Sequence, residues 1–216
     1  MAKTFEDLAK KAKPYLPDVP LPTLVEIGKR VLDDFCTRTL ILKVDADPIT
    51  IAAADYDYAI SFGANEYTPL HIVKATLGSS TLAITNEAAL ELLSPVWESQ
   101  TAATPTHVFL TYDNQVRVYP IPTILLTDTL QLKMVVTYSD DVSVLDDFLM
   151  DNHWRTLVDG IIAECRDLPE RPFTDFALAD RARLKYDKSI AQVRWAVMKS
   201  FGLGSIEVTP VSFEGY

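Results

Sequence analysis

Apolar residues recur every three or four positions in the stretch that follows Thr23. Leu24, Val31, Leu32 and Phe35 fall on one side of a helix with this spacing, and the charged residues between them fall on other sides. The pattern predicts a helix from near Thr23, which is suited to be its N-cap, to near Thr37, with one face buried.

Two further helical patterns occupy the C-terminal part of the chain. The apolar stripe of the first runs from Trp154 to Cys165, and Leu168-Pro169 stops it. The second predicts a longer helix from near Thr174 to about Phe201, terminated by Gly202 and Gly204. Its expected buried face consists of residues at helical spacing: Phe176, Ala179, Ala182, Tyr186, Ile190, Val193, Val197 and Phe201.

The region between these helices favours strands, because its apolar runs are short, rich in β-branched and aromatic residues, and separated by turn residues. The expected strands are 40–44, 49–52, 70–77, 82–84, 108–112, 116–119 and 130–138. Gly78-Ser79-Ser80 and Asp113-Asn114 are typical of tight hairpin loops. A short helix over 86–93, capped by Thr85, is expected to interrupt this antiparallel region.

The two ends of the chain differ from the rest. Residues 1–21 predict a short amphipathic helix and then an extended linker, because prolines prevent a continuous helix; these prolines are Pro14, Pro17, Pro20 and Pro22. In residues 205–216, apolar and polar residues alternate as in an edge strand with no local partner. Such a strand could be donated to a neighbouring chain.

Together these patterns predict an α+β fold in which the N-terminal helix packs with the two C-terminal helices as a helical bundle. Four segments follow from this reading. They are a linker and helix over 1–39, an inserted antiparallel β lobe with one short helix over 40–140, the C-terminal helices over 141–202, and an extended tail over 203–216.

Composition narrows the possible partners. The net charge of −10 argues against broad contact with nucleic-acid backbone, although an acidic surface that repels passing DNA stays compatible with it. No apolar run reaches the roughly 18 residues of a membrane span. Met1–Lys13 lacks the apolar core of a signal peptide, so we expect a protein made in the cytoplasm. Cys36 and Cys165 lie in separate helical patterns, and we expect buried thiols there.

The sequence offers no recognisable catalytic or metal-binding motif, and we expect no enzyme, no metal and no cofactor. The three histidines, His71, His107 and His153, fit structural or exposed roles. The acid pairs Asp45/Asp47 and Asp55/Asp57 could supply oxygen ligands for Ca²⁺, but no glycine-containing loop with a distal glutamate follows either pair. Solvated loop acids are the favoured interpretation.

Aromatic and basic residues mark the candidate contact surface. Trp154 belongs to an apolar stripe and is expected in the core, whereas the role of Trp97 stays open. The last helix is basic within an acidic protein, which fits either a solvated face or complementarity to an acidic partner. Candidate contacts with a neighbouring subunit or another partner on this helix are Arg183, Lys188, Arg194 and Trp195.

At the N-terminal side, Tyr15–Pro20 leads into a helix ending in Asp34–Thr39. This proline-rich lead and Phe-Cys helix end resemble those of the head–tail adaptor proteins of short-tailed bacteriophages. In the middle, Trp97 is followed by Ala103–His107 and by Val116–Pro122, which is similar to the family's tryptophan, small residue–Pro and strand ending in Pro-x-Pro.

Near the C-terminus, Asp159–Ile162 leads to Leu168–Asp175 with Ala179 beyond, which resembles the family's helix, Pro-x-x-Pro-aromatic and helix signature. Phe173 stands where the family more often has tryptophan. The motifs together cover nearly the whole chain.

The resemblance implies a structural protein that forms a ring of about twelve copies between the portal protein and the tail or nozzle protein, with DNA passing through its lumen. It implies location at the head–tail junction of the virion, no membrane contact and no catalytic residues. If it holds, the tail is the candidate portal anchor by strand addition, through Ile206, Val208, Val211, Phe213 and Tyr216.

Two other functions remain open from the sequence. A phage enzyme that degrades cell wall would need an acid pair in a groove, such as Glu98 with a loop aspartate. A receptor- or carbohydrate-binding module would be built on the β region.

Overall fold

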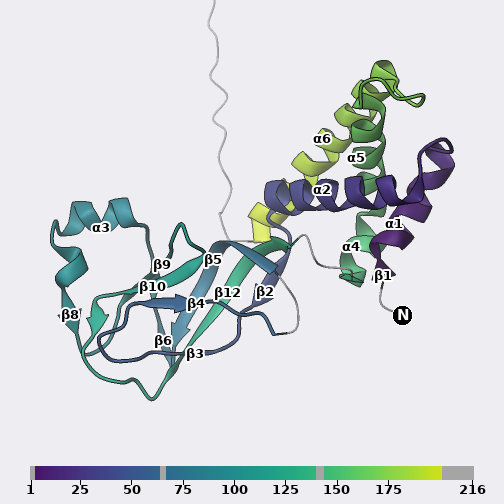
Figure 1. Cartoon of the computed structure of the whole chain (residues 1–216). Helices are drawn as coiled ribbons and strands as arrows, with labels where there is room; N and C mark the ends of the chain where they lie inside the picture. The colour runs from purple at the N-terminus through teal and green to yellow at the C-terminus, as the bar shows by residue number, and fades with distance from the viewer. Residues whose placement is uncertain (1–2, 64–66, 140–143, 201–216) are drawn as a thin grey trace, which may run out of the picture.

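The computed structural model describes residues 3–63, 67–139 and 144–200, and its fold is α+β, as predicted. The helices other than α3 (Glu87–Leu93) gather at one end, and the larger and smaller sheets lie toward the other end together with α3 (Figure 1). The helical lobe consists of α1 (Phe5–Ala12), α2 (Leu21–Thr39), α4 (Asp147–Asn152), α5 (Trp154–Asp167) and α6 (Phe176–Ser200).

As expected, the N-terminal helix α2 packs against both C-terminal helices, α5 and α6. The helix α1 completes the lobe by contacting α2 and α5. A short antiparallel pair ties the chain's start to the entry of α4: β1 (Lys3–Thr4) pairs with β13 (Val144–Leu145). Thr4 then caps α1 by accepting from the Asp7 N–H, while the Asp7 carboxylate accepts from the Thr4 N–H.

The larger sheet forms the part of the β lobe nearest the helices. The strand order is β2 (Lys43–Asp45), β12 (Thr129–Tyr138), β5 (Tyr67–Leu77) and β6 (Ser80–Thr81). A further short strand, β3 (Ile49–Thr50), also pairs with β12. Leu130, Leu132, Met134 and Val136 on β12 are buried, and the strand packs against α2. The main core therefore runs without interruption from the helices into this sheet.

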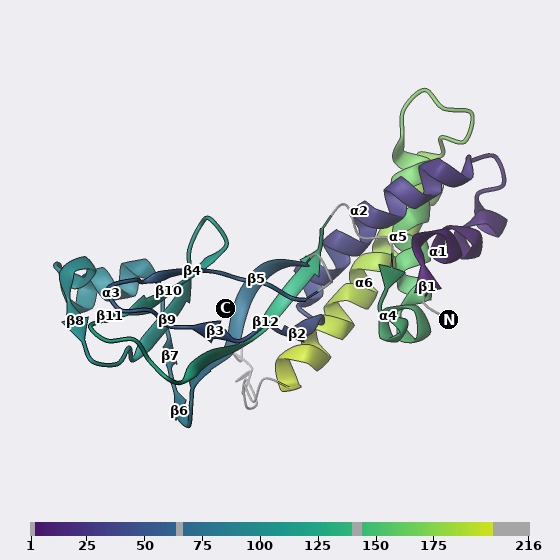
Figure 2. The same ribbon diagram turned by 60° about the horizontal axis from the view of Figure 1, so that its bottom comes forward.

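A smaller sheet and one short helix form the far end of the β lobe (Figures 1 and 2). The sheet order is β4 (Asp57–Ala59), β10 (Gln115–Tyr119), β9 (His107–Leu110) and β7 (Ala83–Ile84). The helix α3 (Glu87–Leu93) and the 3₁₀ turn η2 (Trp97–Ser99) cover it, and β8 (Thr101–Ala102) pairs with β11 (Ile121–Pro122). The β7–β9 and β11–β8 pairs are parallel, although the remaining pairs are antiparallel as predicted.

Both predicted hairpins are present. Leu77 pairs with Ser80 around Gly78-Ser79, and Gly78 has φ of 57°, which glycine adopts without strain. The β9–β10 hairpin turns at Asp113-Asn114, where Asn114 has φ of 59°.

Several predicted boundaries were wrong, and each error has a local cause. The helix α2 starts at Leu21 rather than Thr23, because Pro22 fits its first turn and Pro20 takes the N-cap position. Asn86, not Thr85, caps α3, with its side chain accepting from the Ala89 N–H at 2.8 Å. The strand β4 was missed.

The proline-rich stretch is not an extended linker. It contains a 3₁₀ turn, η1 (Lys13–Tyr15), and buries Leu16 and Val19 completely. The Lys13 ammonium donates to the carbonyls of Pro17 and Val19 at 3.0 and 2.6 Å, which folds this stretch back on itself.

Candidate functional site

The last helix, α6, presents one face to the protein and another to solvent. Ala179, Ala182, Tyr186, Ile190 and Val197 are buried, in agreement with the predicted stripe. Phe176 is an exception: it was expected in the stripe but is 59% exposed, because α6 begins there, beyond the edge of the bundle. Phe201 lies outside the described residues.

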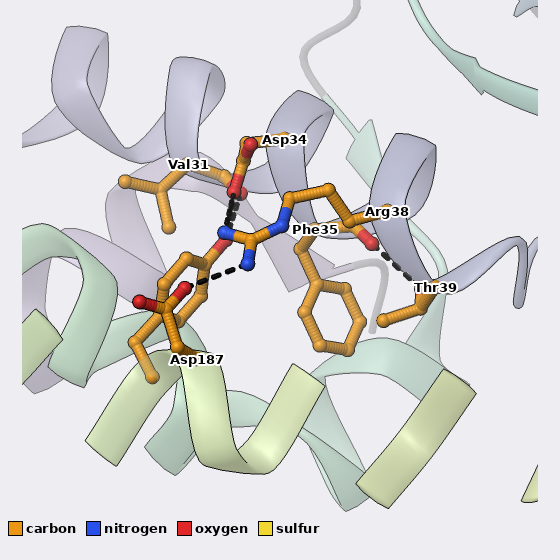
Figure 3. Close-up of polar contacts among 7 residues, drawn as sticks. Val31, Asp34, Phe35, Arg38, Thr39 and Asp187 are labelled. Atoms are coloured by element: carbon orange, nitrogen blue, oxygen red, sulfur yellow. Dashed lines mark hydrogen bonds and ion pairs between the residues drawn. The ribbon is translucent and has the colours of Figure 1, made fainter. Parts of the chain in front are cut away.

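Polar contacts with α2 fix the rotation of α6 about its own axis (Figure 3). The Arg38 guanidinium donates to Asp187 at 2.7 Å and to Asp34 at 3.3 Å. The buried Tyr186 hydroxyl lies 3.0 Å from both the Val31 carbonyl oxygen and an Asp34 carboxylate oxygen. Burial first, and then the Asp34 charge, raise the pKa of Tyr186, so this hydroxyl stays protonated and able to donate.

A glycine lets the helices approach closely at the same place. A Cβ added to Gly160 of α5 would lie 2.5 Å from Val31 Cγ1 and 3.0 Å from the Tyr186 ring. The absence of a side chain at Gly160 thus allows α2, α5 and α6 to meet. The face of α6 that points away from this contact is exposed.

That opposite face carries an apolar stripe, which we call the outer face of α6. Leu184 is 71% exposed, Trp195 62% and Met198 37%. With the exposed Ala177 and Ala191, they recur at intervals of three, four and seven, so they line one side of the helix. Large apolar side chains placed in this way on a surface helix typically mark a contact with another protein.

Charges of opposite sign flank the outer face. By helical spacing, Arg181, Lys188 and Lys199 lie along one margin. Asp180 lies along the other, together with Asp187, whose carboxylate already accepts from Arg38. The Lys199 ammonium sits 3.4 Å from the Trp195 ring centroid. An apolar seam between unlike charged margins is the arrangement with which helices select a partner and its direction.

The predicted contact residues on α6 divide between two sides of the helix. Trp195 belongs to the outer face, Lys188 lies along its basic margin, and the exposed Arg194 lies beside its acidic margin. Arg183 instead points toward α5, where it pairs with Asp167 at 2.8 Å. Sequence reasoning missed Leu184 and Met198, because it searched α6 for one apolar face; the seven-residue spacing of Ala177, Leu184, Ala191 and Met198 was the signal for a second.

The candidate portal-anchoring residues Ile206, Val208, Val211, Phe213 and Tyr216 lie outside the described residues.

A pocket of about 320 Å³ opens at the far end of the β lobe. Tyr56, Trp97, Glu98, Arg117 and Tyr119 contribute to its lining. Arg117 donates from Nε and one terminal nitrogen to the two oxygens of Asp57, both at 2.6 Å, and its guanidinium lies 4.9 Å from the Tyr56 ring centroid. The open role of Trp97 is thereby assigned to packing, since it is buried against the rings of Phe109 and Tyr119.

The residues weighed for other chemistry are dispersed. Asp47 accepts from the Gly63 N–H, and Asp45 lies 3.9 Å from Lys133. Within 3–63, 67–139 and 144–200, no three His, Cys, Asp or Glu side chains form a group that could hold a metal ion.

Cys36 and Cys165 are free, buried thiols, as expected, and burial raises the pKa of Cys165 to about 12. Trp154 is partly buried against the main core, with the Lys11 ammonium 4.5 Å from its ring centroid.

Comparison of the sequence with models of known protein families found no match, and comparison with curated proteins found none either. Among the described helices, none is both long and apolar enough to cross a membrane.

Proposed function

We propose that this protein is a structural head–tail adaptor of a tailed phage, which forms a ring between the portal protein and the tail or nozzle protein. The outer face of α6 is the observation that carries the proposal. It exposes Leu184, Trp195 and Met198 on a helix whose other face is fixed to the bundle.

A ring assembly needs a contact surface of this kind on each subunit. In a cyclic ring each subunit uses two different surfaces, one toward each neighbour, and the contacts close by rotation. The basic margin of the outer face complements an acidic surface, and the chain's net charge of −10 makes acidic surfaces common on a neighbouring copy. Each contact can be weak, because closing the ring on a portal adds them together.

The order of sequence motifs supports the same proposal, and so does the division of the molecule into a helical lobe and a β lobe. In this assignment the helical lobe contacts the portal and neighbouring copies, the β lobe faces the tail, and DNA passes through the lumen without sequence-specific binding. The virion's head–tail junction is the corresponding location.

Light scattering tests the proposal on the purified protein, alone and mixed with the portal ring encoded near it. We expect a complex that holds about twelve copies of this chain. No association with the portal at any salt concentration would contradict the proposal.

A double variant, Leu184→Ser with Trp195→Ser, tests the outer face itself. Removing two exposed apolar side chains leaves folding nearly unchanged but is expected to weaken ring formation at least about tenfold, because central aromatic and leucine contacts dominate interfaces. The matched control is Leu92→Ser on α3, which changes a leucine that is 90% exposed but lies far from α6. Equal effects of the two variants would remove the outer face from the proposal.

The pocket lined by Tyr56 and Arg117 favours a carbohydrate-binding module as the second candidate. An exposed tyrosine ring beside fixed polar groups is a common way to hold a sugar ring. Titration with neutral and acidic sugars, followed by tryptophan fluorescence, tests this candidate. A response that Tyr56→Ala abolishes and Tyr112→Ala leaves intact would support it.

A further inference from the structure

One face of the larger sheet gathers lysines from three neighbouring strands. Lys74 on β5 lies directly opposite Lys133 on β12, and both are exposed. Lys43 on β2 lies opposite Val135, two residues along β12 from Lys133. Directly opposite residues, and residues i and i+2 of one strand, point to the same face of a sheet. The three lysines therefore share one face, which we call the lysine face.

The lysine face carries positive charge that its neighbours offset only in part. Like charges directly opposite each other on adjacent strands are destabilising. Burial first, and then the charge of Lys133, lower the pKa of Lys43, so these lysines act on one another electrostatically. Asp45 lies 3.9 Å from Lys133, but Lys74 forms no ion pair within the described parts of the chain. A bound anion would relieve this repulsion.

Hydrogen-bond donors lie beside the lysines. A hollow of about 440 Å³ opens on this face, and Lys74, Lys133, Thr76 and Gln131 contribute to its lining together with Asp45. Thr76 lies directly opposite Gln131, next to the lysine pair. A hydroxyl and an amide beside two ammonium groups supply the donors that phosphate oxygens accept.

The composition of the lysine face favours nucleic acid over protein as its occupant. None of the large apolar side chains that the described chain exposes lies on β2, β5 or β12. Protein interfaces depend on apolar and aromatic anchors, and lysine is depleted at their centres. Interfaces with DNA are instead polar and positively charged, and many of their hydrogen bonds go to phosphate oxygens.

We propose that the lysine face binds the phosphate backbone of duplex DNA without reading its sequence. The three strands, about 4.8 Å apart, span about 10 Å, which is about the axial length over which one DNA strand places three phosphates. The protein's net charge of −10 repels DNA, but at about 0.1 M salt the charges more than about 10 Å away are largely screened. The contact at the lysine face persists under these conditions.

This inference rests on the proposed function only for its location, because a ring around the DNA channel would turn the lysine face of each copy toward the lumen. Three ammonium groups bind a DNA backbone weakly, which suits DNA that must move, and the copies of a ring add their contacts. Binding of DNA by the isolated chain needs neither ring nor portal, so the two proposals can fail separately.

Titration of the isolated chain with a DNA duplex of about 12 base pairs, followed by the NMR shifts of its backbone amides, tests the inference. We expect the largest shifts at 43–45, 74–76 and 131–133. The logarithm of the binding constant is expected to fall with the logarithm of the salt concentration with a slope of about −2.7, since each neutralised phosphate contributes about −0.9. Largest shifts at other residues would overturn the proposal.

A double variant, Lys74→Gln with Lys133→Gln, removes two of the three charges and is expected to bind the duplex at least about tenfold more weakly. The matched control is Lys10→Gln with Lys185→Gln, which removes the same charge from exposed positions on α1 and α6. The control is expected to change the affinity less than twofold. Equal weakening by the two double variants would reduce the effect to net charge and overturn the proposal.

A gain of binding separates the site from any effect on folding. Asp45→Asn removes the carboxylate beside Lys133 and is expected to tighten binding at least about threefold, because the freed ammonium can neutralise a further phosphate. Unchanged or weaker binding would count against the lysine face.

Two other anions, inorganic phosphate and hexaglutamate, identify the class of occupant when they are compared with the duplex at equal concentration of charge. Smaller shifts than with the duplex support DNA. Equal or larger shifts with phosphate would assign the face to a small anion, and equal or larger shifts with hexaglutamate would assign it to an acidic protein segment. Either result would overturn the proposal.

Discussion

The helical lobe and the far end of the β lobe bury their apolar residues in different ways. In the helical lobe, Leu8, Leu24, Leu32 and Phe35 are fully buried in a core that continues into the larger sheet. At the far end, one face of the smaller sheet joins the same core through Val108, Val116 and Val118, whereas Leu90, Trp97, Phe109 and Tyr119 form a separate cluster on the other face. Leu92, Leu93 and Val96 beside it are 90%, 70% and 62% exposed.

This difference indicates that the helical lobe is the more rigid part of the molecule and the far end the less firmly held part. The helical lobe is held by a deep core and by the Arg38–Asp187 and Tyr186–Val31 contacts, so α6 can present a fixed surface. At the far end, Leu90 is the buried residue of α3, so this helix and η2 are held mainly by the small separate cluster. Regions with few buried contacts open at lower free energy than the rest of a protein. A partner that covers Leu92 and Leu93 would stabilise the far end more than it stabilises the helices.

Replacing one buried aromatic residue by alanine in each region has the largest expected effect and tests whether the two regions are held independently. Phe35→Ala removes a fully buried ring from the main core and is expected to lower the free energy of unfolding by about 4 kcal/mol. Trp97→Ala is expected to loosen α3 and its neighbours while the helices keep their protection. Denaturant titration with amide exchange measures both, and a global loss of protection in Trp97→Ala would refute the division into two regions.

The next largest expected effect on the free energy of unfolding comes from a substitution where α2, α5 and α6 approach closely. Gly160→Ala places a Cβ 2.5 Å from Val31 Cγ1 and is expected to cost about 2 kcal/mol through overpacking. Gly28→Ala is the matched control, because its Cβ would meet Ile161 at 3.6 Å and Leu8 at 3.7 Å, which are ordinary contacts. That change is expected to stabilise α2 by about 0.5 kcal/mol. Thermal unfolding of both variants decides whether Gly160 is required.

Removing the Tyr186 hydroxyl tests the polar contacts between α2 and α6, with a smaller expected loss of stability. Tyr186→Phe keeps the ring but loses the hydrogen bonds with Val31 and Asp34, which is expected to lower stability by about 1 kcal/mol. The outer face of α6 would then be held less firmly, so ring formation is also expected to weaken. Unchanged stability and unchanged association would show that packing alone orients α6.

The smallest expected effect is a pH dependence that belongs to the helical lobe. Burial lowers the pKa of His153, whose ring lies 5.4 Å from that of Phe35 and 5.5 Å from that of Phe148. The unfolded chain, with its histidine near the ordinary value of 6.5, therefore binds the proton more readily than the folded chain. Stability conferred by the neutral ring is present above that value and is lost as the pH falls toward the folded pKa.

His153→Phe removes this titration, so the variant is expected to lose less stability than the parent between pH 8 and pH 5.5. Urea unfolding at several pH values measures the difference, with the comparison at pH 8 as the reference. Parallel pH profiles would show that His153 does not carry the effect.

Local patterns in the sequence were sufficient to predict much of this protein. Helical spacing located the stripe of α5 and the buried side of α6, and turn residues located both hairpins, because each of these features depends on residues close in the chain. The α+β class followed from the order of these elements. The same reasoning missed β4, whose three residues become a strand only through pairing with β10.

Other properties were decided only by the tertiary structure, because they depend on residues far apart in the chain. Arg38 meets Asp187, and Gly160 meets Val31 and Tyr186, only after the helices have packed. That packing determines which apolar residues of α6 are buried and which form the outer face.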